Sequence, residues 1–438
     1  MKSKINVGLV GFGTVGTGTA KILLENRDLV ARRVGVPLVL QRIVDLDLTT
    51  DRGIVLPDGL LSSDLSGLLN DPEIDIVIEL IGGYDTAKRV MLDAMAQGKH
   101  VVTANKALLA VHGEDLFTAA ARAGLDVGFE ASVGGGIPII RSLTEGLAAN
   151  RFAAIVGILN GTANYILTQM LKERQDFEDA LTQAQTKGYA EADPTFDIEG
   201  IDSLHKLAIM ISLAYGTPVN VKDIFTEGIK HVTALDIQYA SELGMAVKLL
   251  GIAKLHDGEI EARVHPTLIG KDSPLAQVHG VYNAIHIVGD AVGDVMLYGQ
   301  GAGAMPTGSA VVSDVIDIAR SIQKQTSGRV PPTSFPEPQR IPIRIRSKEE
   351  LTSRYYLRCM VQDRPGVLSQ ISGVLGNHGI SIMSVLQQGR HEAQAVPLVI
   401  MTHRALERSV QTALQEINQM SFVVSPSTTL IRVEDGEY

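Results

Sequence analysis

The chain has 438 residues, of which 45% are hydrophobic and 20% are charged, and its formal net charge at pH 7 is −10. This length predicts two or three globular domains, and the negative charge argues against nucleic acid and anionic membranes as principal partners. A single cysteine, Cys359, excludes an internal disulfide framework, and no apolar run reaches the roughly 18 residues of a membrane-spanning helix, so we expect a cytoplasmic protein that binds neither nucleic acid nor membrane.

The first part of the chain alternates between short apolar strands and amphipathic helices. The expected strands lie at 5–10, 38–44, 75–80 and 100–103, and the expected helices at 15–25 and 85–97. Strands that alternate with helices predict a parallel sheet covered by helices. We expect this α/β module to span residues 1–130.

A glycine-rich turn follows the first of these strands. The stretch VGLVGFGTVGTG, residues 7–18, contains the pattern G-x-G-x-x-G. Such glycines permit a tight turn and the close approach of a pyrophosphate at the start of the next helix. The pattern predicts a dinucleotide site of the Rossmann type, and the alternative is a tight turn that binds nothing. The residues expected to contact the dinucleotide are Gly11, Phe12, Gly13, Thr14, Val15 and Gly16.

Two acidic residues follow the second strand. Asp45 comes 29 residues after Gly16, later than the usual spacing of about 20, because the segment LLENRDLVARRVGVP is long. At the end of the second strand a carboxylate is placed to accept hydrogen bonds from the adenosine ribose and to repel the 2′-phosphate of NADP, although either this residue or Asp47 could also be a solvated loop acid. Asp47 is the alternative for this role, and Arg42 offers a cation to the phosphate. We therefore expect the cofactor to be NADP or NAD, with NAD used at least as well.

Lys106 follows the fourth strand. In a parallel sheet the carboxyl ends of the strands line the ligand crevice, so a lysine in the sequence Thr103-Ala-Asn-Lys106 is placed over the cofactor. The alternative is a lysine on the protein surface.

The middle of the chain, residues 131–324, combines helices with strands. Helical periodicity is present at 161–174 and 202–216, and strands are expected at 264–269 and 284–288. We expect an α+β catalytic and dimerisation domain whose last helix packs back on the first domain.

The segment GYAEADPTFDIEGIDSLHKLAI, residues 188–209, carries a cluster of charges. They are Glu191, Asp193, Asp197, Asp202 and Lys206. Asp202 and Lys206 are four residues apart, so one face of a helix presents both side chains. The alternative for these two residues is a plain helical ion pair.

The last part of the chain follows a change in composition. Residues 325–353 begin with the proline-rich stretch QTSGRVPPTSFPEPQR, which is typical of a linker. Residues 354–438 then predict the order strand, helix, strand, strand, helix, strand of a ferredoxin-like sandwich. These elements are expected at 355–361, 366–376, 381–387, 395–402, 405–419 and 423–433.

Several long motifs together resemble the homoserine dehydrogenase family, and the resemblance covers the whole chain. They are EASVGGGIP from Glu130, LNGTANYIL from Leu159, the segment 188–209, and GQGAGAMPTGSAVVSDVIDIAR from Gly299. The C-terminal unit resembles an ACT domain through DRPGVL from Asp363 and NHGIS from Asn377. Because no aspartate kinase module precedes these motifs, we expect the monofunctional form.

This resemblance implies the reversible NAD(P)-dependent reduction of L-aspartate 4-semialdehyde to L-homoserine, in the biosynthesis of threonine, methionine and isoleucine. By the family pattern, Lys206 is the acid/base at the substrate oxygen, and Lys106 is a second cation at the nicotinamide and the substrate. Glu191 has the charge to hold the substrate ammonium group, and Asp202 either shares this role or orients Lys206. A lysine ammonium both polarises a carbonyl and protonates an alkoxide.

Residues 130–137 resemble the family's loop for a monovalent cation. The backbone oxygens of Val133, Gly135 and Ile137, with the carboxylate of Glu130, suit a hard ion such as sodium. The alternative is a glycine-rich connection that binds no ion.

The ACT-like unit predicts feedback regulation. The turn that contains Asp363 and Gly366 leads into a helix whose first N–H groups can hold a carboxylate. Asp363 or Asn377 is placed to hold the ammonium or hydroxyl group of a small amino acid, and we expect L-threonine to bind here and inhibit. The alternative is a domain that only dimerises. The family resemblance also suggests a homodimer or a homotetramer.

Two other functions remain open at this point. A non-catalytic sensor would join a dinucleotide site to an amino-acid site and would not need Lys206 and Glu191 together. Another ACT-containing dehydrogenase of an amino-acid pathway, such as a hydroxy-acid dehydrogenase, would require a His/Glu or Arg/His catalytic set. The signal in this sequence consists of lysines and carboxylates instead.

Overall fold

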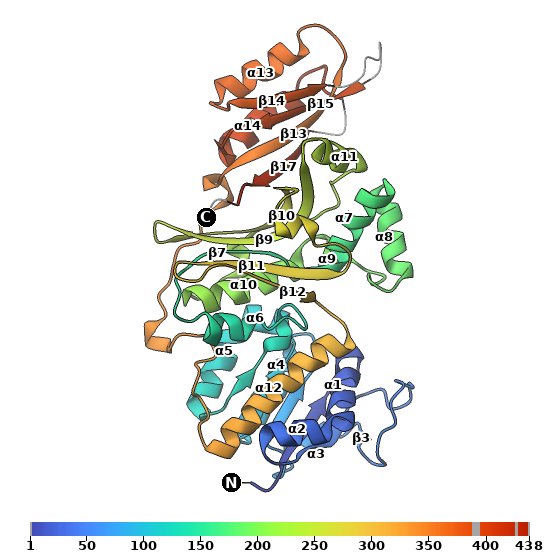
Figure 1. Ribbon diagram of the computed structural model, residues 1–438, viewed down its shortest axis with the longest axis vertical. Helices are drawn as coiled ribbons and strands as arrows, with labels where there is room; N and C mark the ends of the chain where they lie inside the picture. The colour runs from blue at the N-terminus through green and yellow to red at the C-terminus, as the bar shows by residue number, and fades with distance from the viewer. Residues whose placement is uncertain (1, 388–394, 425–427, 437–438) are drawn as a thin grey trace. The chain divides into compact units, whose positions relative to one another are not determined.

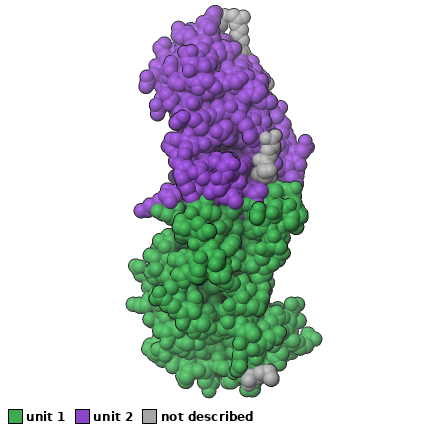
Figure 2. Space-filling view, turned by 90° about the vertical axis from the view of Figure 1, so that its left-hand side faces the viewer, with its two compact units in different colours: residues 1–152, 205–221, 282–343 green, residues 153–204, 222–281, 344–438 purple. Residues whose placement is uncertain are grey.

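The computed structural model describes residues 2–387, 395–424 and 428–436. The chain forms two compact units, and each unit is built from separate stretches of sequence (Figure 2). Unit 1 contains residues 1–152, 205–221 and 282–343, and unit 2 contains residues 153–204, 222–281 and 344–438. The boundaries of the four consecutive domains expected from the sequence stay a prediction.

A six-stranded parallel sheet forms the centre of unit 1, which confirms the predicted α/β module (Figure 1). In spatial order its strands are β3 (Leu61–Ser62), β2 (Leu38–Val44), β1 (Ile5–Val10), β4 (Ile76–Glu79), β5 (His100–Thr103) and β6 (Val127–Gly128). Every residue of β1 is buried, which fits a central strand covered on both faces. The strand order reverses between β1 and β4, so the ligand crevice of such a sheet lies at the carboxyl ends of these two strands.

Helices connect the strands of this sheet. They are α1 (Thr14–Glu25), α2 (Arg27–Val34), α3 (Leu65–Leu69), α4 (Asp85–Ala96) and α5 (Lys106–Ala123), and the short α6 (Ile139–Arg141) follows. Unit 1 also contains the antiparallel hairpin of β11 (Tyr282–Gly289) and β12 (Gly293–Gln300).

Helix α12 (Ala304–Lys324) packs on α1, although the two helices are far apart in sequence. A Cβ atom on Gly18 would lie 2.1 Å from the backbone oxygen of Ala304, so glycine is required for this approach. Val311 and Val315 are fully buried in the same hydrophobic core as Ile5. No helix in the described parts of the chain, α12 included, is long and apolar enough to span a membrane.

Unit 2 is organised around a largely antiparallel sheet. In spatial order its strands are β7 (Phe152–Ile158), β9 (Met245–His256), β10 (Glu259–Gly270), β17 (Thr429–Glu434), β13 (Thr352–Gln362), β15 (Ala395–Thr402) and β14 (Ile382–Gln387). The short β8 (Phe225–Thr226) pairs with β10, and β16 (Ala405–Leu406) pairs with β13. The helices around this sheet are α7 (Gly161–Glu173), α8 (Phe177–Thr186), α9 (Thr195–Ile198), α11 (Ala234–Glu242), α13 (Val367–Asn377) and α14 (Glu407–Asn418), and α10 (Ile201–Tyr215) follows α9 in the chain.

The C-terminal elements have the predicted ferredoxin-like order, with a shorter last strand. That strand was expected at 423–433 and is observed as β17, while residues 425–427 of the expected range lie outside the described residues. Strand β17 pairs antiparallel with β13 and parallel with β10, where Leu268 faces Val433 in the register. One continuous sheet in unit 2 therefore contains strands of both the middle and the C-terminal segments.

The proline-rich segment 328–343, called the strap below, is bound to unit 1. The N–H of Gly328 donates to the carboxylate of Asp126 at 2.7 Å, and the guanidinium of Arg340 contacts the carboxylate of Glu114 at 2.5 and 2.6 Å. Although its composition is typical of a linker, the strap is therefore anchored to unit 1.

Candidate active site

Glycine is required at two positions of the turn between β1 and α1. Gly11 has a φ of +99°, and a Cβ atom on Gly16 would lie 2.1 Å from the backbone oxygen of Gly11. At Gly13, in contrast, no atom lies within 4 Å of the place that a Cβ atom would take, and no side chain caps α1. Because the first N–H groups of a helix lack intrahelical partners, the turn has space and donors for a pyrophosphate.

Asp45 lies beside this glycine turn. Its Oδ2 accepts the N–H of Phe12 at 2.5 Å, and its Oδ1 accepts the N–H of Asp47 at 2.8 Å. The guanidinium of Arg52 lies 3.8 Å from Asp45 and 3.3 Å from Asp47. The same guanidinium lies over the ring of Phe12, at 4.9 Å from its centroid. The expected ribose carboxylate is therefore accompanied by a cation.

Arg52 was not among the residues expected to contact the cofactor. Arg42 was expected to offer this cation, but its Nε lies 3.2 Å from a carboxylate oxygen of Asp71. Arg52 follows Asp45 in a loop after β2, outside any recognisable motif. Only the fold of this loop shows that the Arg52 side chain lies beside Asp45.

The carboxyl ends of β4 and β5 carry a second group of polar residues. Glu79 is fully buried, and its carboxylate accepts the hydroxyl of Thr103 at 2.8 Å and the N–H of Ile81 at 2.8 Å. Burial raises the pKa of Glu79 above its ordinary value. Lys106 is the first residue of α5, which is capped by the side chain of Asn105. The sheet thus brings Lys106 to the same edge as the glycine turn, as the parallel strand order predicts.

Asp202 and Lys206 lie one turn apart on α10, and both side chains are buried. The carboxylate of Asp202 accepts a hydrogen bond from the side-chain amide of Asn160 at 2.8 Å. Glu191, in contrast, is exposed, on the connection between α8 and α9. Asn160 was not among the expected site residues, because an asparagine before a helix is ordinarily a helix cap.

The loop expected to hold a monovalent cation is mostly buried. The two carboxylate oxygens of Glu130 accept the N–H groups of Ile140 and Arg141, at 2.8 and 2.9 Å. Burial and the nearby carboxylate of Asp314 raise the pKa of Glu130 to about 7. Val133, Gly135 and Ile137 belong to the same loop, and Gly135 has a φ of +57°. No group of three or more His, Cys, Asp or Glu side chains with a metal-binding arrangement occurs among the described residues.

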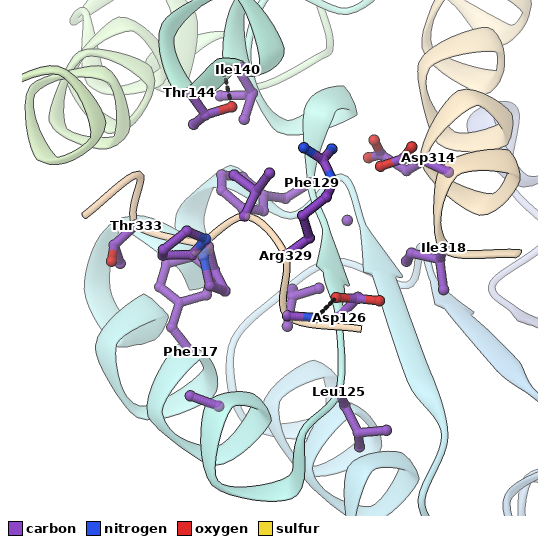
Figure 3. A pocket seen from close by; sticks show the side chains of 18 of the residues that line it. Phe117, Leu125, Asp126, Phe129, Ile140, Thr144, Asp314, Ile318, Arg329 and Thr333 are labelled. Carbon is purple, nitrogen blue, oxygen red and sulfur yellow. Dashed lines mark hydrogen bonds between the residues drawn. The ribbon is translucent and has the colours of Figure 1, made fainter. Parts of the chain in front are cut away.

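A cavity of about 330 Å³ lies next to Glu130 within unit 1 (Figure 3). Helices α5 and α12 and the strap line it, and Figure 3 shows Asp126 hydrogen-bonded to the strap. The three arginines of its lining are each paired with a carboxylate, in the pairs Arg141–Asp314, Arg329–Glu145 and Arg340–Glu114. The glycine turn and Lys106 do not line this cavity, and neither do Asp202 and Lys206.

The residues expected to hold an effector lie at opposite ends of α13. Gly366 precedes the helix with a φ of +90°, Asp363 lies in the turn before it, and Asn377 is the last helical residue. A helix of 11 residues is about 16 Å long. Within one chain, Asn377 is therefore not brought to the turn that contains Asp363.

Comparisons with known proteins agree on one family. Family models match at residues 11–130 (homoserine dehydrogenase, NAD-binding domain), 138–316 (homoserine dehydrogenase) and 355–422 (ACT domain). Homoserine dehydrogenases of Neisseria gonorrhoeae and Bacillus subtilis are 45% and 40% identical, each over 98% of both chains. The structure of a homoserine dehydrogenase from Thiobacillus denitrificans has a TM-score of 0.92 and 44% identity, covering 99% of this chain and 98% of its own. A hyperthermophilic archaeal homoserine dehydrogenase in complex with NADPH has a TM-score of 0.60 and 28% identity, covering 72% of this chain and 97% of its own.

Proposed function

This chain belongs to the homoserine dehydrogenase family, and from that membership we propose how its residues carry out the reaction. The protein is an NAD(P)-dependent oxidoreductase that interconverts L-aspartate 4-semialdehyde and L-homoserine. The observation that carries this function is the similarity to homoserine dehydrogenases over the full length of the chain. The nicotinamide, when bound, exchanges a hydride with the carbon that bears the substrate oxygen.

The glycine turn and Asp45 are the groups that would hold the dinucleotide. The open side of Gly13 and the uncapped start of α1 suit the pyrophosphate, and Asp45 suits the adenosine ribose. We propose that NAD is used at least as well as NADP, because a carboxylate repels the 2′-phosphate. The guanidinium of Arg52 lies beside Asp45 and gives NADP a compensating cation.

Lys206 is our candidate for the acid/base. The substrate oxygen gains negative charge during reduction, and a lysine ammonium both stabilises this charge and supplies the proton. In the oxidative direction the same amine must be neutral to accept the proton. Because the ordinary pKa of lysine is about 10.4, homoserine oxidation is expected to be faster at alkaline pH.

Three further side chains are proposed to place the substrate and the nicotinamide. Glu191 and Asp202 carry the negative charge that the substrate ammonium group requires, and Lys106 supplies a second cation near the nicotinamide. Glu191 is exposed, which suits a side chain that contacts the substrate as it enters from solvent. Asp202 is buried, which suits a side chain that holds the substrate ammonium group or orients Lys206 from a fixed position.

Three finer proposals concern the ion, the effector and the assembly. We propose that the loop of Glu130, Val133, Gly135 and Ile137 binds sodium. We also propose that L-threonine binds the ACT domain and inhibits, and that the protein is a homodimer or a homotetramer. The ACT match at 355–422 supports an amino-acid effector.

The function is tested by the absorbance of the reduced nicotinamide when homoserine is added to the purified protein at alkaline pH. We expect an increase with NAD⁺ and with NADP⁺, and none with L-serine, which lacks one methylene group. No change with homoserine under either cofactor would contradict the function and favour a non-catalytic sensor.

A further inference from the structure

Glu79 is a buried carboxylate at the carboxyl end of β4, and its relative exposure is 0%. Its Oε1 accepts the N–H groups of Ile81 and Gly82 at 2.8 and 3.3 Å, and its Oε2 accepts the hydroxyl of Thr103 at 2.8 Å. The same hydroxyl accepts the N–H of Asn105 at 3.0 Å, so it uses its own hydrogen towards Glu79. Every partner therefore donates to Glu79, which is the pattern of an ionised carboxylate.

The negative charge of Glu79 is not balanced by a cation of the protein. In the parts of the chain that the structure describes, no lysine, arginine or histidine forms an ion pair with it, and its hydrogen-bond donors are neutral. Burial raises the pKa of Glu79, and these hydrogen bonds act in the opposite direction. Because buried charges are ordinarily paired, an unpaired one in a ligand crevice indicates a positive charge that arrives with the ligand.

The strand order places Glu79 on the nicotinamide side of the crevice. In a sheet of this order the dinucleotide lies across the reversal between β1 and β4. Asp45 directly follows β2 and is proposed for the adenosine ribose, so the nicotinamide half falls over the ends of β4 and β5. Glu79 and Thr103 are the last residues of these two strands.

The turn after β4 also packs against the glycine turn. A Cβ atom on Gly11 would lie 2.8 Å from the backbone nitrogen of Ile81, which is one of the donors to Glu79. The peptide that binds the buried carboxylate is therefore in contact with the turn proposed for the pyrophosphate. This contact brings the charge of Glu79 close to the cofactor without exposing the side chain.

We propose that Glu79 is a specificity-determining residue whose charge favours binding of the oxidised cofactor over the reduced one. The nicotinamide ring is positively charged in NAD⁺ and NADP⁺ and loses this charge on reduction, so a fixed carboxylate attracts only the oxidised ring. Lys106, at the start of α5, is proposed near the same ring, and its charge acts in the opposite sense. The inference rests on the proposed function and adds to it a residue that selects between the two redox states.

The variant Glu79→Gln removes the charge and keeps the shape of the side chain. Its amide oxygen can accept the N–H groups of Ile81 and Gly82, and its amide nitrogen can donate to the hydroxyl of Thr103. Two unit charges about 10 Å apart change a binding constant by about tenfold at an effective dielectric constant of about 20. We therefore expect the Kd for NAD⁺, divided by the Kd for NADH, to rise about tenfold. Calorimetric titration measures both constants without turnover.

Two further variants separate charge from structure. Asp75→Asn removes a carboxylate at the amino end of the same strand, away from the crevice, and should leave the ratio unchanged. Glu79→Asp keeps the charge and should keep most of the wild-type ratio. If Glu79 only braced the turn at Ile81, both dissociation constants would rise together and Glu79→Asp would be the more damaging change.

An unchanged ratio in Glu79→Gln, or an equal rise in both constants, would overturn the proposal. If this variant does not fold, Thr103→Val replaces it. Loss of the hydroxyl donor disfavours the charged carboxylate, so the ratio should move in the same direction by a smaller factor. An unchanged ratio in Thr103→Val would also overturn the proposal. A wild-type protein that binds both redox states in this way but does not oxidise homoserine would instead contradict the proposed function.

Discussion

Lys206 is the residue on which the proposed chemistry depends most. Substitution by alanine removes the only group that we assign to proton transfer at the substrate oxygen. We expect Lys206→Ala to lower kcat about 10²- to 10⁴-fold in both directions, the usual range for a general acid/base, without a change in fold. Steady-state rates and circular dichroism measure the two effects.

The control for this variant is Lys21→Ala, because Lys21 lies on the accessible side of α1 and pairs only weakly with Glu25. It should keep the wild-type rate. If Lys206→Ala retains more than about a tenth of the wild-type activity, against the loss expected of an acid/base, its assigned role is wrong.

Arg52 is expected to decide how well the protein accepts NADPH. Its guanidinium lies beside Asp45 and Asp47, where the 2′-phosphate of NADP would meet otherwise repulsive carboxylates. We expect Arg52→Ala to raise the KM for NADPH about tenfold or more, since charged hydrogen bonds are lost, and to change the KM for NADH little. Arg42→Ala is the control, because Arg42 is paired with Asp71 instead.

Two results would disagree with this account of the cofactor site. An unchanged ratio of the NADPH and NADH specificity constants in Arg52→Ala would remove Arg52 from the site. A wild-type protein that prefers NADPH by more than tenfold would show that Asp45 does not meet the ribose as proposed.

The carboxylate of Glu130, which accepts two backbone N–H groups of α6, makes the stability of the protein depend on pH. Its raised pKa of about 7 means that the folded protein holds this proton more tightly than the unfolded chain does. The contribution of Glu130 to the free energy of unfolding is therefore fully present below about pH 4.5 and is lost as the pH rises through 7. At 1.36 kcal/mol per pKa unit, this loss amounts to about 3 kcal/mol. The variant Glu130→Gln cannot titrate here and should lack this loss.

Calorimetric unfolding at several pH values between 4.5 and 8 measures this effect. Glu25→Gln, an exposed position on α1, should keep the wild-type pH profile. Parallel profiles for the wild type and Glu130→Gln would refute the linkage. Sodium, if it binds this loop, favours the charged carboxylate and should reduce the loss in the wild type.

The elements that the sequence predicted well are those with a local signal. The strands of the parallel sheet are short apolar runs. The turn at Gly11 has the pattern G-x-G-x-x-G, which predicts a dinucleotide site when a strand precedes it and a helix follows it. Strand β9 was missed because MAVKLLGIAKLH has no polar alternation: eight of its consecutive residues are buried in the sheet. The parallel pairing of β17 with β10 joins segments that are far apart in sequence, which no local pattern encodes.

The same distinction applies to the candidate site. Lys206 and Asp202 were predicted as site residues because helical spacing and long motifs mark them, and their roles stay a prediction. Arg52 and Asn160 were not predicted, because the fold brings their partners to them: Asp45 lies beside Arg52, and Asp197 accepts a hydrogen bond from Asn160. A side chain whose partners come from separate elements leaves no pattern in its own neighbourhood of the sequence.

The proposed inhibition by L-threonine concerns the whole molecule and has to be tested on the full-length chain. Strand β17 pairs with residues 267–269 of β10, and the strap is anchored to unit 1. A truncation before the strap would remove both and leave the backbone groups of β10 that face β17 unpaired, and unpaired strand edges promote aggregation. Point variants of the ACT domain avoid this loss.

We expect L-threonine to inhibit the full chain and Asp363→Ala to weaken this inhibition about tenfold or more, with unchanged basal activity. Linkage requires that threonine bind the more and the less active states with different affinity. Asn377→Ala tests the other end of α13 separately. The effector assignment is wrong if threonine leaves the wild-type rate unchanged, or if neither variant alters the inhibition.

Homoserine oxidation by this chain requires the transfer of a hydride from homoserine to a nicotinamide. The most direct measurement uses L-homoserine that carries two deuterium atoms on C4, the carbon that bears the hydroxyl group. During oxidation by the full-length protein we expect one deuterium to appear on C4 of the nicotinamide ring of the reduced cofactor, and we expect Lys206→Ala to slow this transfer. A reduced cofactor without deuterium, or no reduced cofactor at all with either NAD⁺ or NADP⁺, would contradict this hydride transfer.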